Sequence, residues 1–227
     1  MSAIAENPER IFAMFATKDE NMMGIYEVTI TKNGERRQVI LDNKIPCIKG
    51  ENGRMNPFFS KANGDELWVA ILEKAWAKVH GSYERIIDGK AHETLRDLLG
   101  APAEEFSTKS EDVLDSIIDA DRRGYIVTVE IGKKDEESKE VSEPEKKGLI
   151  QNHTYSLLNI DRIEKDGEAL FLIKLRNPWG EVEWNGEWCA TSKNWTPELK
   201  VRLGLSMLDD GTFWLSFTDF QKYFDRV

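Results

Sequence analysis

Three stretches of the chain repeat apolar residues at helical spacing. Residues 65–80 carry the clearest pattern and predict an amphipathic helix that ends at Gly81, because glycine favours the left-handed cap of a helix. Residues 111–123 predict a second helix, preceded by the capping box Thr108-x-x-Glu111. Residues 5–15 have the spacing of the end of a helix. The apolar positions of the first helix are Leu67, Trp68, Ile71, Leu72, Ala75 and Val79.

Other stretches have the composition of strands. Residues 25–30 and 38–41 flank Asn33-Gly34, a pair that favours the tight turn of a β-hairpin. Beyond residue 124 the chain is enriched in β-branched and aromatic residues, with partial alternation. Four strands are predicted there, at residues 125–131, 153–163, 169–176 and 213–217. We therefore expect an α+β fold whose second part is an antiparallel β-structure.

The pattern also suggests where the chain divides. Residues 1–89 contain the helix end, the hairpin and the long helix, and we predict that they form one domain. Residues 90–227 contain the four strands and form the second domain, with residues 100–102 (Gly-Ala-Pro) as the link. Residues 51–64 and 133–147 are polar, and the second stretch is mostly charged, so both are predicted to be surface loops.

Composition excludes several classes of protein. The chain has 227 residues with a net charge of −10, so nucleic acid is not an expected partner. No apolar run is long enough for a membrane span, and the first residues do not have the pattern of a secretory signal. Two cysteines are too few for a disulfide framework and indicate a reducing compartment. We expect an intracellular, cytoplasmic protein.

One of the three histidines is a candidate for catalysis. The sequence has three histidines, of which His80 ends a helix, where a cation suits the helix dipole, and His92 follows no pattern. His153 opens one predicted strand, and Asn177 follows directly after the next one. Trp179 lies two residues after Asn177. An asparagine bound to one ring nitrogen leaves the other nitrogen free as a base, and a nearby tryptophan excludes water. This is the arrangement that a Cys-His-Asn thiol protease needs.

Four long motifs carry a resemblance to a known family. They are DELWVAILEKAWAKVHGSYE at residues 65–84, NHTYSL at 152–157, RNPWGEVEWNGEW at 176–188 and DDGTFWLSFTDF at 209–220. In this order and at this spacing, they resemble the protease core of the calpains, the calcium-dependent cysteine endopeptidases. The resemblance covers the chain from Ser2 to Val227.

The resemblance implies a papain-like core of two lobes. The first lobe would be incomplete, and the second would be an antiparallel, β-barrel-like lobe with flanking helices. His153 would be the general base, Asn177 would orient it within hydrogen-bonding reach, and Trp179 would lie beside the pair. The family's catalytic cysteine and oxyanion glutamine correspond to positions before Ser2, so they are not in this chain. Neither Cys47 nor Cys189 matches the nucleophile, and the chain as written is expected to be an inactive, truncated core.

The resemblance also implies calcium and protein substrates. Glu66 matches a ligand position of the first lobe, and Glu183, Leu208 (through its carbonyl) and Asp210 match ligand positions of the second. Ala190 and Thr212 replace two carboxylates of that second site, so its calcium binding should be weak or lost. No organic cofactor is implied. The partners would be protein or peptide substrates in extended conformation, and other domains of a longer calpain.

Two alternatives stay open at this point. The chain could belong to a non-catalytic calpain homologue that acts by binding proteins or calcium. It could also be a tryptophan-rich binding module, because most of its seven tryptophans lie between Trp179 and Trp214. The retention of His153 together with Asn177 favours a protease, since a binding scaffold has little physical need for both.

Overall fold

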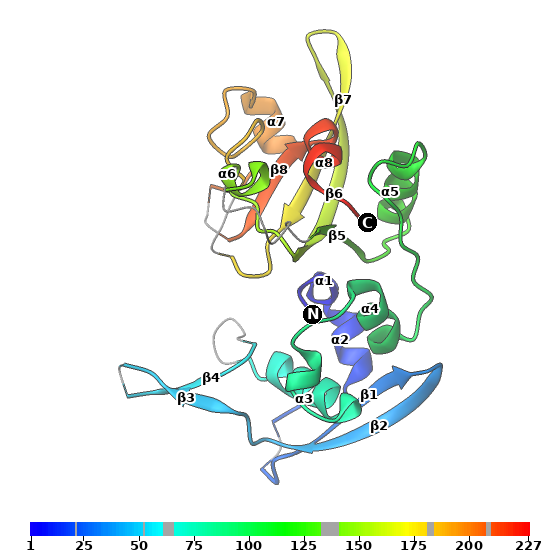
Figure 1. The fold of residues 1–227 in the computed structure, drawn as a ribbon, viewed down its shortest axis with the longest axis vertical. Helices are drawn as coiled ribbons and strands as arrows, with labels where there is room; N and C mark the ends of the chain where they lie inside the picture. The colour runs from blue at the N-terminus through cyan, green and yellow to red at the C-terminus, as the bar shows by residue number, and fades with distance from the viewer. Residues whose placement is uncertain (21, 52, 61–65, 133–140, 181–183, 208–209) are drawn as a thin grey trace. The chain divides into compact units, whose positions relative to one another are not determined.

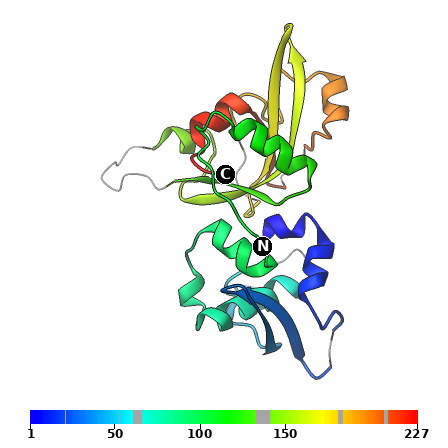
Figure 2. The same ribbon diagram turned by 90° about the vertical axis from the view of Figure 1, so that its right-hand side faces the viewer.

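The computed structural model of the protein describes all residues except 21, 52, 61–65, 133–140, 181–183 and 208–209. The described chain divides into two compact units, one formed by most of residues 1–104 and the other by residues 105–227. Figures 1 and 2 show the helices and strands of each unit.

The first unit combines short helices with two small antiparallel sheets, β1-β2 and β3-β4. Asn33 and Gly34 have φ values of 55° and 79°, as the tight turn of the predicted hairpin requires. Lys32 and Glu35 pair directly across this turn. The elements are α1 (Ser2–Ala5), α2 (Pro8–Met14), β1 (Ile25–Lys32), β2 (Glu35–Asp42), β3 (Cys47–Lys49), β4 (Met55–Pro57), α3 (Trp68–His80), the 3₁₀ helix η1 (Glu84–Ile86) and α4 (Ala91–Leu99).

Helix α3 ends as the sequence predicts. Gly81 adopts a φ of 102°, and its N–H donates to the carbonyl of Ala77. By contrast, the single helix predicted over residues 5–15 is divided into α1 and α2. Asn7 is extended, with φ −128° and ψ 93°, and Pro8 begins α2, where its missing N–H costs nothing.

The boundary between the units lies beyond the predicted one at Gly89. Helix α4, which the sequence analysis did not predict, belongs to the first unit. Its buried Asp97 accepts a hydrogen bond from Lys32 of β1 at 2.6 Å, and its Leu98 is also buried. Because these contacts attach α4 to the hairpin, the division falls after the Gly-Ala-Pro link at residues 100–102 rather than before the helix.

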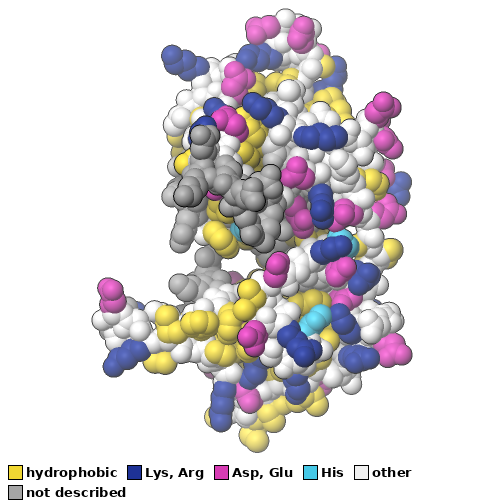
Figure 3. All heavy atoms as spheres, in the orientation of Figure 1, with side chains coloured by type: hydrophobic (Ala, Val, Ile, Leu, Met, Phe, Trp, Pro, Cys, Tyr) yellow, Lys and Arg dark blue, Asp and Glu magenta, His cyan; other side chains and the backbone are white. Residues whose placement is uncertain are grey.

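The β3-β4 ribbon lies partly within the stretch predicted as a loop at residues 51–64. Its two strands are short, and apolar side chains stand on its surface (Figure 3). Ile48, Met55 and the adjoining Phe58 are all exposed. The predicted loop therefore contains a strand, and residues 52 and 61–64 of it lie outside the described residues.

The second unit is built on one four-stranded antiparallel sheet in the order β5-β6-β7-β8. Within the described residues β5 pairs only with β6 among the strands, and β8 pairs only with β7, so the sheet is open. The β-barrel-like lobe expected from the sequence is thus wrong, although the antiparallel pairing and the flanking helices are present. The elements are α5 (Val113–Arg122), β5 (Val127–Ile131), α6 (Glu143–Lys146), β6 (His153–Lys165), β7 (Glu168–Arg176), α7 (Pro197–Arg202), β8 (Thr212–Ser216) and α8 (Phe217–Tyr223).

Both faces of this sheet are covered by apolar side chains. One face packs against α5 and α8, which lie on the same side (Figure 2). The other face packs against a cluster that includes Trp188, Trp195 and Leu203. Strand β8 shows the alternation, because Phe213 and Leu215 enter the first cluster while Trp214 enters the second.

Two capping devices differ from the prediction. Thr108 does not cap a helix; its buried hydroxyl donates to the carbonyl of Phe224 at 2.5 Å, and α5 begins only at Val113. A complete capping box instead joins Ser142 and Glu145 at the start of α6. The charged stretch predicted as a loop therefore contains this short helix, and residues 133–140 of it lie outside the described residues.

Candidate active site

The antiparallel register of β6 and β7 brings the two predicted site residues together. His153 is the first residue of β6, and Asn177 follows directly after the last residue of β7. Ser156 pairs with Arg176, so the start of one strand lies beside the end of the other. The side chains of His153 and Asn177 therefore meet at one end of the sheet.

A short hydrogen bond connects the two side chains. Nε2 of His153 lies 2.9 Å from Oδ1 of Asn177, within the range expected from the sequence. The backbone N–H of Trp179 donates to the same Oδ1 at 3.0 Å, which identifies that atom as the amide oxygen. Because an amide oxygen only accepts, Nε2 of His153 must carry the hydrogen. In the neutral ring Nδ1 is then the atom with a free lone pair.

Burial tunes the ring toward its neutral form. Removal of His153 from water lowers its pKa below the ordinary value of 6.5, and the hydrogen bond to Asn177 offsets only part of this effect. Asn177 itself is 1% exposed, so its amide cannot exchange the histidine for water without a cost. The ring is therefore held in one tautomer and is mostly unprotonated near pH 7.

Two aromatic rings contact His153. Trp179 lies at 4.5 Å between ring centroids, with an interplanar angle of 52°, and Tyr155 meets the ring edge-on at 5.0 Å. Trp179 is 63% exposed, so it covers one side of the histidine and presents its own outer face to solvent. The predicted proximity of Trp179 is present, but its shielding of the hydrogen bond is partial.

Tyr155 supports the site in a way that the sequence analysis did not anticipate. Its hydroxyl accepts the backbone N–H of Ile150 at 2.7 Å, and its ring is 1% exposed. Burial raises the pKa of Tyr155 to about 12, so the phenol stays neutral. The signal was its spacing, since Tyr155 stands two residues after His153 on the same face of β6.

The candidate calcium ligands are only partly described. Glu183 and Leu208 lie outside the described residues. The carboxylate of Glu66 accepts the indole N–H of Trp68 at 2.9 Å. That of Asp210 accepts the backbone and hydroxyl hydrogens of Thr212 at 2.9 and 2.6 Å. In the part of the chain that the structure describes, no three His, Cys, Asp or Glu side chains gather as metal ligands do.

Neither cysteine has the surroundings of a nucleophile. Cys47 is exposed on the β3-β4 ribbon of the first unit, and its thiol donates to the carbonyl of Ile45. Cys189 is partly buried in the second unit, and its sulfur lies 3.5 Å from the hydroxyl of Thr191. The exclusion of both cysteines as nucleophiles stays a prediction.

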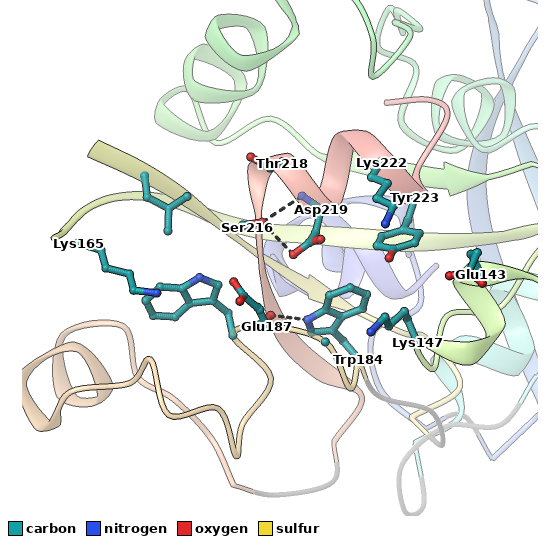
Figure 4. Close-up of a pocket in the computed structure, with 13 residues that line it drawn as sticks. Glu143, Lys147, Lys165, Trp184, Glu187, Ser216, Thr218, Asp219, Lys222 and Tyr223 are labelled. Carbon is teal, nitrogen blue, oxygen red and sulfur yellow. Dashed lines mark hydrogen bonds between the residues drawn. The ribbon is translucent and has the colours of Figure 1, made fainter. Parts of the chain in front are cut away.

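A separate cavity of about 610 Å³ opens in the second unit between α6, α8 and the turn at residues 184–188 (Figure 4). Trp184 and Tyr223 form part of its wall, and Lys147, Glu187 and Asp219 provide charges. The indole N–H of Trp184 donates to the carbonyl of Glu187 at 2.6 Å. His153 and Asn177 are not among the residues that line it, so this cavity is distinct from the candidate active site.

Across the described residues, no helix has the length and apolar character that crossing a membrane would require.

Comparison with known proteins gives a consistent result along the chain. A family model described as calpain family cysteine protease matches residues 1–227. Calpain-9 of Rattus norvegicus is 36% identical over 209 residues, which cover 90% of this chain and 29% of that protein. The calpain-2 catalytic subunit of Homo sapiens is 33% identical over 223 residues, covering 96% and 31%. The calpain-type cysteine protease DEK1 of Zea mays is 35% identical over 240 residues, covering 100% and 11%.

Proposed function

The chain belongs to the calpain family of cysteine proteases, and from this premise we propose that it supplies the base and the orienting residue of a Cys-His-Asn endopeptidase. His153 is the proposed general base and Asn177 the residue that orients it. The chain spans less than a third of the length of the relatives described above. The observation that carries the proposal is the 2.9 Å hydrogen bond from Nε2 of His153 to Oδ1 of Asn177.

The chemistry follows from the tautomer. Nδ1 of His153 can take the proton of a cysteine thiol, which leaves a thiolate and an imidazolium. The thiolate attacks the peptide carbonyl carbon, and the imidazolium then gives its proton to the leaving amine as the C–N bond breaks. Water hydrolyses the resulting thioester with the same histidine as the base. Asn177 keeps its contact with Nε2 throughout, so the ring does not rotate away from the sulfur.

The lowered pKa of His153 suits the first of these steps. A ring that is neutral near pH 7 is ready to accept a proton, whereas a ring that is already protonated is not. A thiolate beside the ring would then raise the pKa of His153 by its negative charge, which stabilises the ion pair. Burial therefore favours the neutral ring before the proton moves. The Asn177 amide, which raises the pKa of His153, favours the imidazolium after the proton has moved.

We propose that the nucleophile comes from outside these 227 residues. The chain would then not hydrolyse peptides by itself, because neither Cys47 nor Cys189 is proposed as the nucleophile. The substrates proposed are extended segments of intracellular proteins, and the partners are other domains of a longer calpain. Calcium is proposed as a weak ligand of the second unit, because Ala190 and Thr212 provide no carboxylate there.

One experiment tests the catalytic proposal. The upstream segment of a calpain relative that carries its cysteine would be joined in frame before residue 2, and hydrolysis of unfolded casein would be measured. We expect activity and covalent labelling by a thiol-reactive peptide, both lowered at least about 100-fold by His153→Ala. The matched control is His92→Ala, which removes a histidine of the first unit and should leave activity near that of the parent.

The outcomes separate the candidate functions. Activity in the joined protein, its loss in His153→Ala and none in the 227-residue chain support the proposal. A joined protein that folds and binds casein without cleaving it would favour a non-catalytic homologue. Activity of the unjoined chain that persists in the Cys47→Ala, Cys189→Ala double variant would show that the nucleophile has been misplaced.

A further inference from the structure

We propose that the turn formed by Asp210, Gly211 and Thr212, here named the Asp210 turn, positions Asn177, and that Gly211 is the residue through which it acts. The inference rests on the proposed function, in which Asn177 orients His153. It adds a positioning residue that lies far from His153 in the sequence and does not touch the histidine in any described hydrogen bond.

Gly211 contacts the backbone of Asn177 in two ways. Its carbonyl accepts the N–H of Asn177 at 2.8 Å. A Cβ added at Gly211 would lie 2.6 Å from the carbonyl oxygen of Asn177 and 2.8 Å from Cα of Gly180. Both distances are shorter than real contacts of a Cβ atom, and the atoms met are backbone atoms that cannot swing aside. The turn and the Asn177–Gly180 segment therefore pack together without room for a methyl group.

The requirement for glycine here is not only conformational. Gly211 has a φ of +75°, which disfavours any L-residue with a side chain. Gly167 and Gly204 in the same unit have φ values of +83° and +57°, yet a Cβ at either would meet nothing within 4 Å. These two glycines serve their own turns, whereas Gly211 also leaves space for the backbone that carries Asn177. The comparison separates backbone strain from close packing.

The Asp210 turn is itself fixed to the strand that ends at Asn177. Oδ1 of Asp210 accepts the N–H of Thr212 at 2.9 Å and its hydroxyl at 2.6 Å. Thr212 is the first residue of β8 and pairs with Arg176, the last residue of β7. A series of short contacts thus runs from Asp210 through Thr212 and Gly211 to Asn177, and from its amide oxygen to His153.

A side chain at position 211 should shift Asn177 far enough to disturb its contact with His153. A methyl group at position 211 would have to push the Asn177 backbone away by about 0.5 Å, which is the tolerance within which catalytic groups are held. The Asn177 amide oxygen accepts from both His153 and the N–H of Trp179. It cannot follow such a shift and keep both bonds in good geometry, so the hydrogen bond to Nε2 of His153 is the one exposed to loss.

The test uses a signal that a general loss of stability does not produce. A hydrogen-bonded imidazole N–H gives a slowly exchanging proton resonance in NMR, and His153 should show one at Nε2. We expect Gly211→Ala to lose this resonance and to speed hydrogen exchange at the Asn177 N–H at least about tenfold. The control Gly167→Ala introduces the same positive-φ strain in the same unit, and it should retain both signals.

A milder pair of variants covers the case in which Gly211→Ala does not fold. Thr212→Val keeps the glycine and removes the hydroxyl that binds Asp210, and it should weaken the Nε2 resonance of His153. Thr212→Ser keeps the hydroxyl and should preserve it. An unchanged resonance in folded Gly211→Ala, or in Thr212→Val, overturns the positioning role while leaving the His153–Asn177 pair intact. Absence of the resonance from the parent protein overturns the pair itself, and with it both this inference and the proposed function.

Discussion

The surroundings of His80 and His153 look alike by most measures. His80 lies at the end of α3 in the first unit, and His153 lies at the start of β6 in the second. Each ring is partly buried beside a tryptophan, with centroid distances of 4.2 Å to Trp76 and 4.5 Å to Trp179. Burial lowers the pKa of both rings below 6.5. Each ring also has a hydrogen-bond partner at Nε2.

The chemical type of that partner is what separates them. Nε2 of His80 lies 3.3 Å from Nζ of Lys32, and a lysine ammonium can only donate. His80 must therefore accept at Nε2 and carry its hydrogen on Nδ1. Nε2 of His153 faces an amide oxygen that can only accept, so its hydrogen lies on Nε2 instead. The two histidines are opposite tautomers in similar surroundings.

This difference decides which ring can act as a base. The Nε2 lone pair of His80 is occupied by Lys32, whose ammonium also binds the buried Asp97 at 2.6 Å and lies over Trp76. In the described part of the chain, Nδ1 of His153 has no hydrogen-bond partner. A histidine beside a tryptophan is therefore not a base by virtue of burial or a lowered pKa alone. A partner that only accepts hydrogen bonds at one nitrogen is needed to free the other.

The largest effect should come from disrupting the contacts that join His80, Lys32, Asp97 and Trp76, here named the His80 cluster. Asp97 is 4% exposed and binds two cations, Lys32 at 2.6 Å and Arg96 at 3.3 Å. Lys32→Met removes the closer one and should lower the free energy of unfolding by about 2–3 kcal/mol. The pKa of His80 should rise because the charge of Lys32 lowers it in the parent. Urea unfolding and an NMR titration of His80 measure the two effects.

The matched control for this prediction is Lys78→Met, which removes another lysine that binds a carbonyl of the hairpin, that of Ile40. Because this lysine is exposed, the loss should stay below about 1 kcal/mol. Equal losses in the two variants, or an unchanged His80 pKa in Lys32→Met, would contradict the description of the cluster.

The next largest effect is expected on the pKa of His153. Asn177→Asp replaces the amide by a carboxylate of the same shape, and its charge should raise the pKa of His153 by about one unit or more. The pKa of His80 should not change. Titration of the ring protons by NMR measures both values in one sample. A His153 pKa that stays at the parent value would mean that residue 177 does not face the ring in solution.

The smallest effect is the pH dependence that the two rings share. Both pKa values lie below 6.5 in the folded protein, so the unfolded chain takes up protons first as the pH falls. The free energy of unfolding should therefore decrease as the pH drops through about 6.5 toward the folded-state values. His80→Gln and His153→Gln should each flatten this decrease, and the double variant should flatten it most. A double variant with the slope of the parent would refute the assignment.

Features set by local sequence could be predicted. The Asn33-Gly34 turn and the Gly81 cap depend on residues that adopt a positive φ, and both are present where expected. The His153–Asn177 contact was also accessible, because it follows from where two antiparallel strands begin and end. Predicting this contact required only the boundaries of the two strands, together with the motifs that resemble calpains.

Features set by distant contacts could not be predicted. The pairing of β6 with β7 shifts between Leu157 and Asn159, so Leu157 faces one core cluster and Ile163, six positions on, faces the other. A strict period of two places both on one face. The open sheet is a further case, since neither edge strand carries a local signal that separates an open sheet from a closed barrel.

His80 combines one feature that could be predicted from the sequence with one that could not. Its position at the end of a helix predicts a structural role, and its contacts with Trp76 and Lys32 agree with that role. A cation at this position would also suit the helix dipole, but its surroundings favour the neutral ring. Burial, then the charge of Lys32, lowers the pKa of His80, although Asp97 acts in the opposite direction. Lys32 is far from His80 in the sequence, so its influence was invisible there.

The most direct test of the central claim is a long-range ¹H–¹⁵N correlation spectrum of the histidine rings near pH 7.5. The account predicts that His153 carries its hydrogen on Nε2 with Nδ1 unprotonated, and that His80 shows the reverse pattern. Assignment is simple because the chain has three histidines, each of which can be removed in turn. If His153 carries its hydrogen on Nδ1, it cannot be the base that Asn177 orients, and the proposed active site is contradicted.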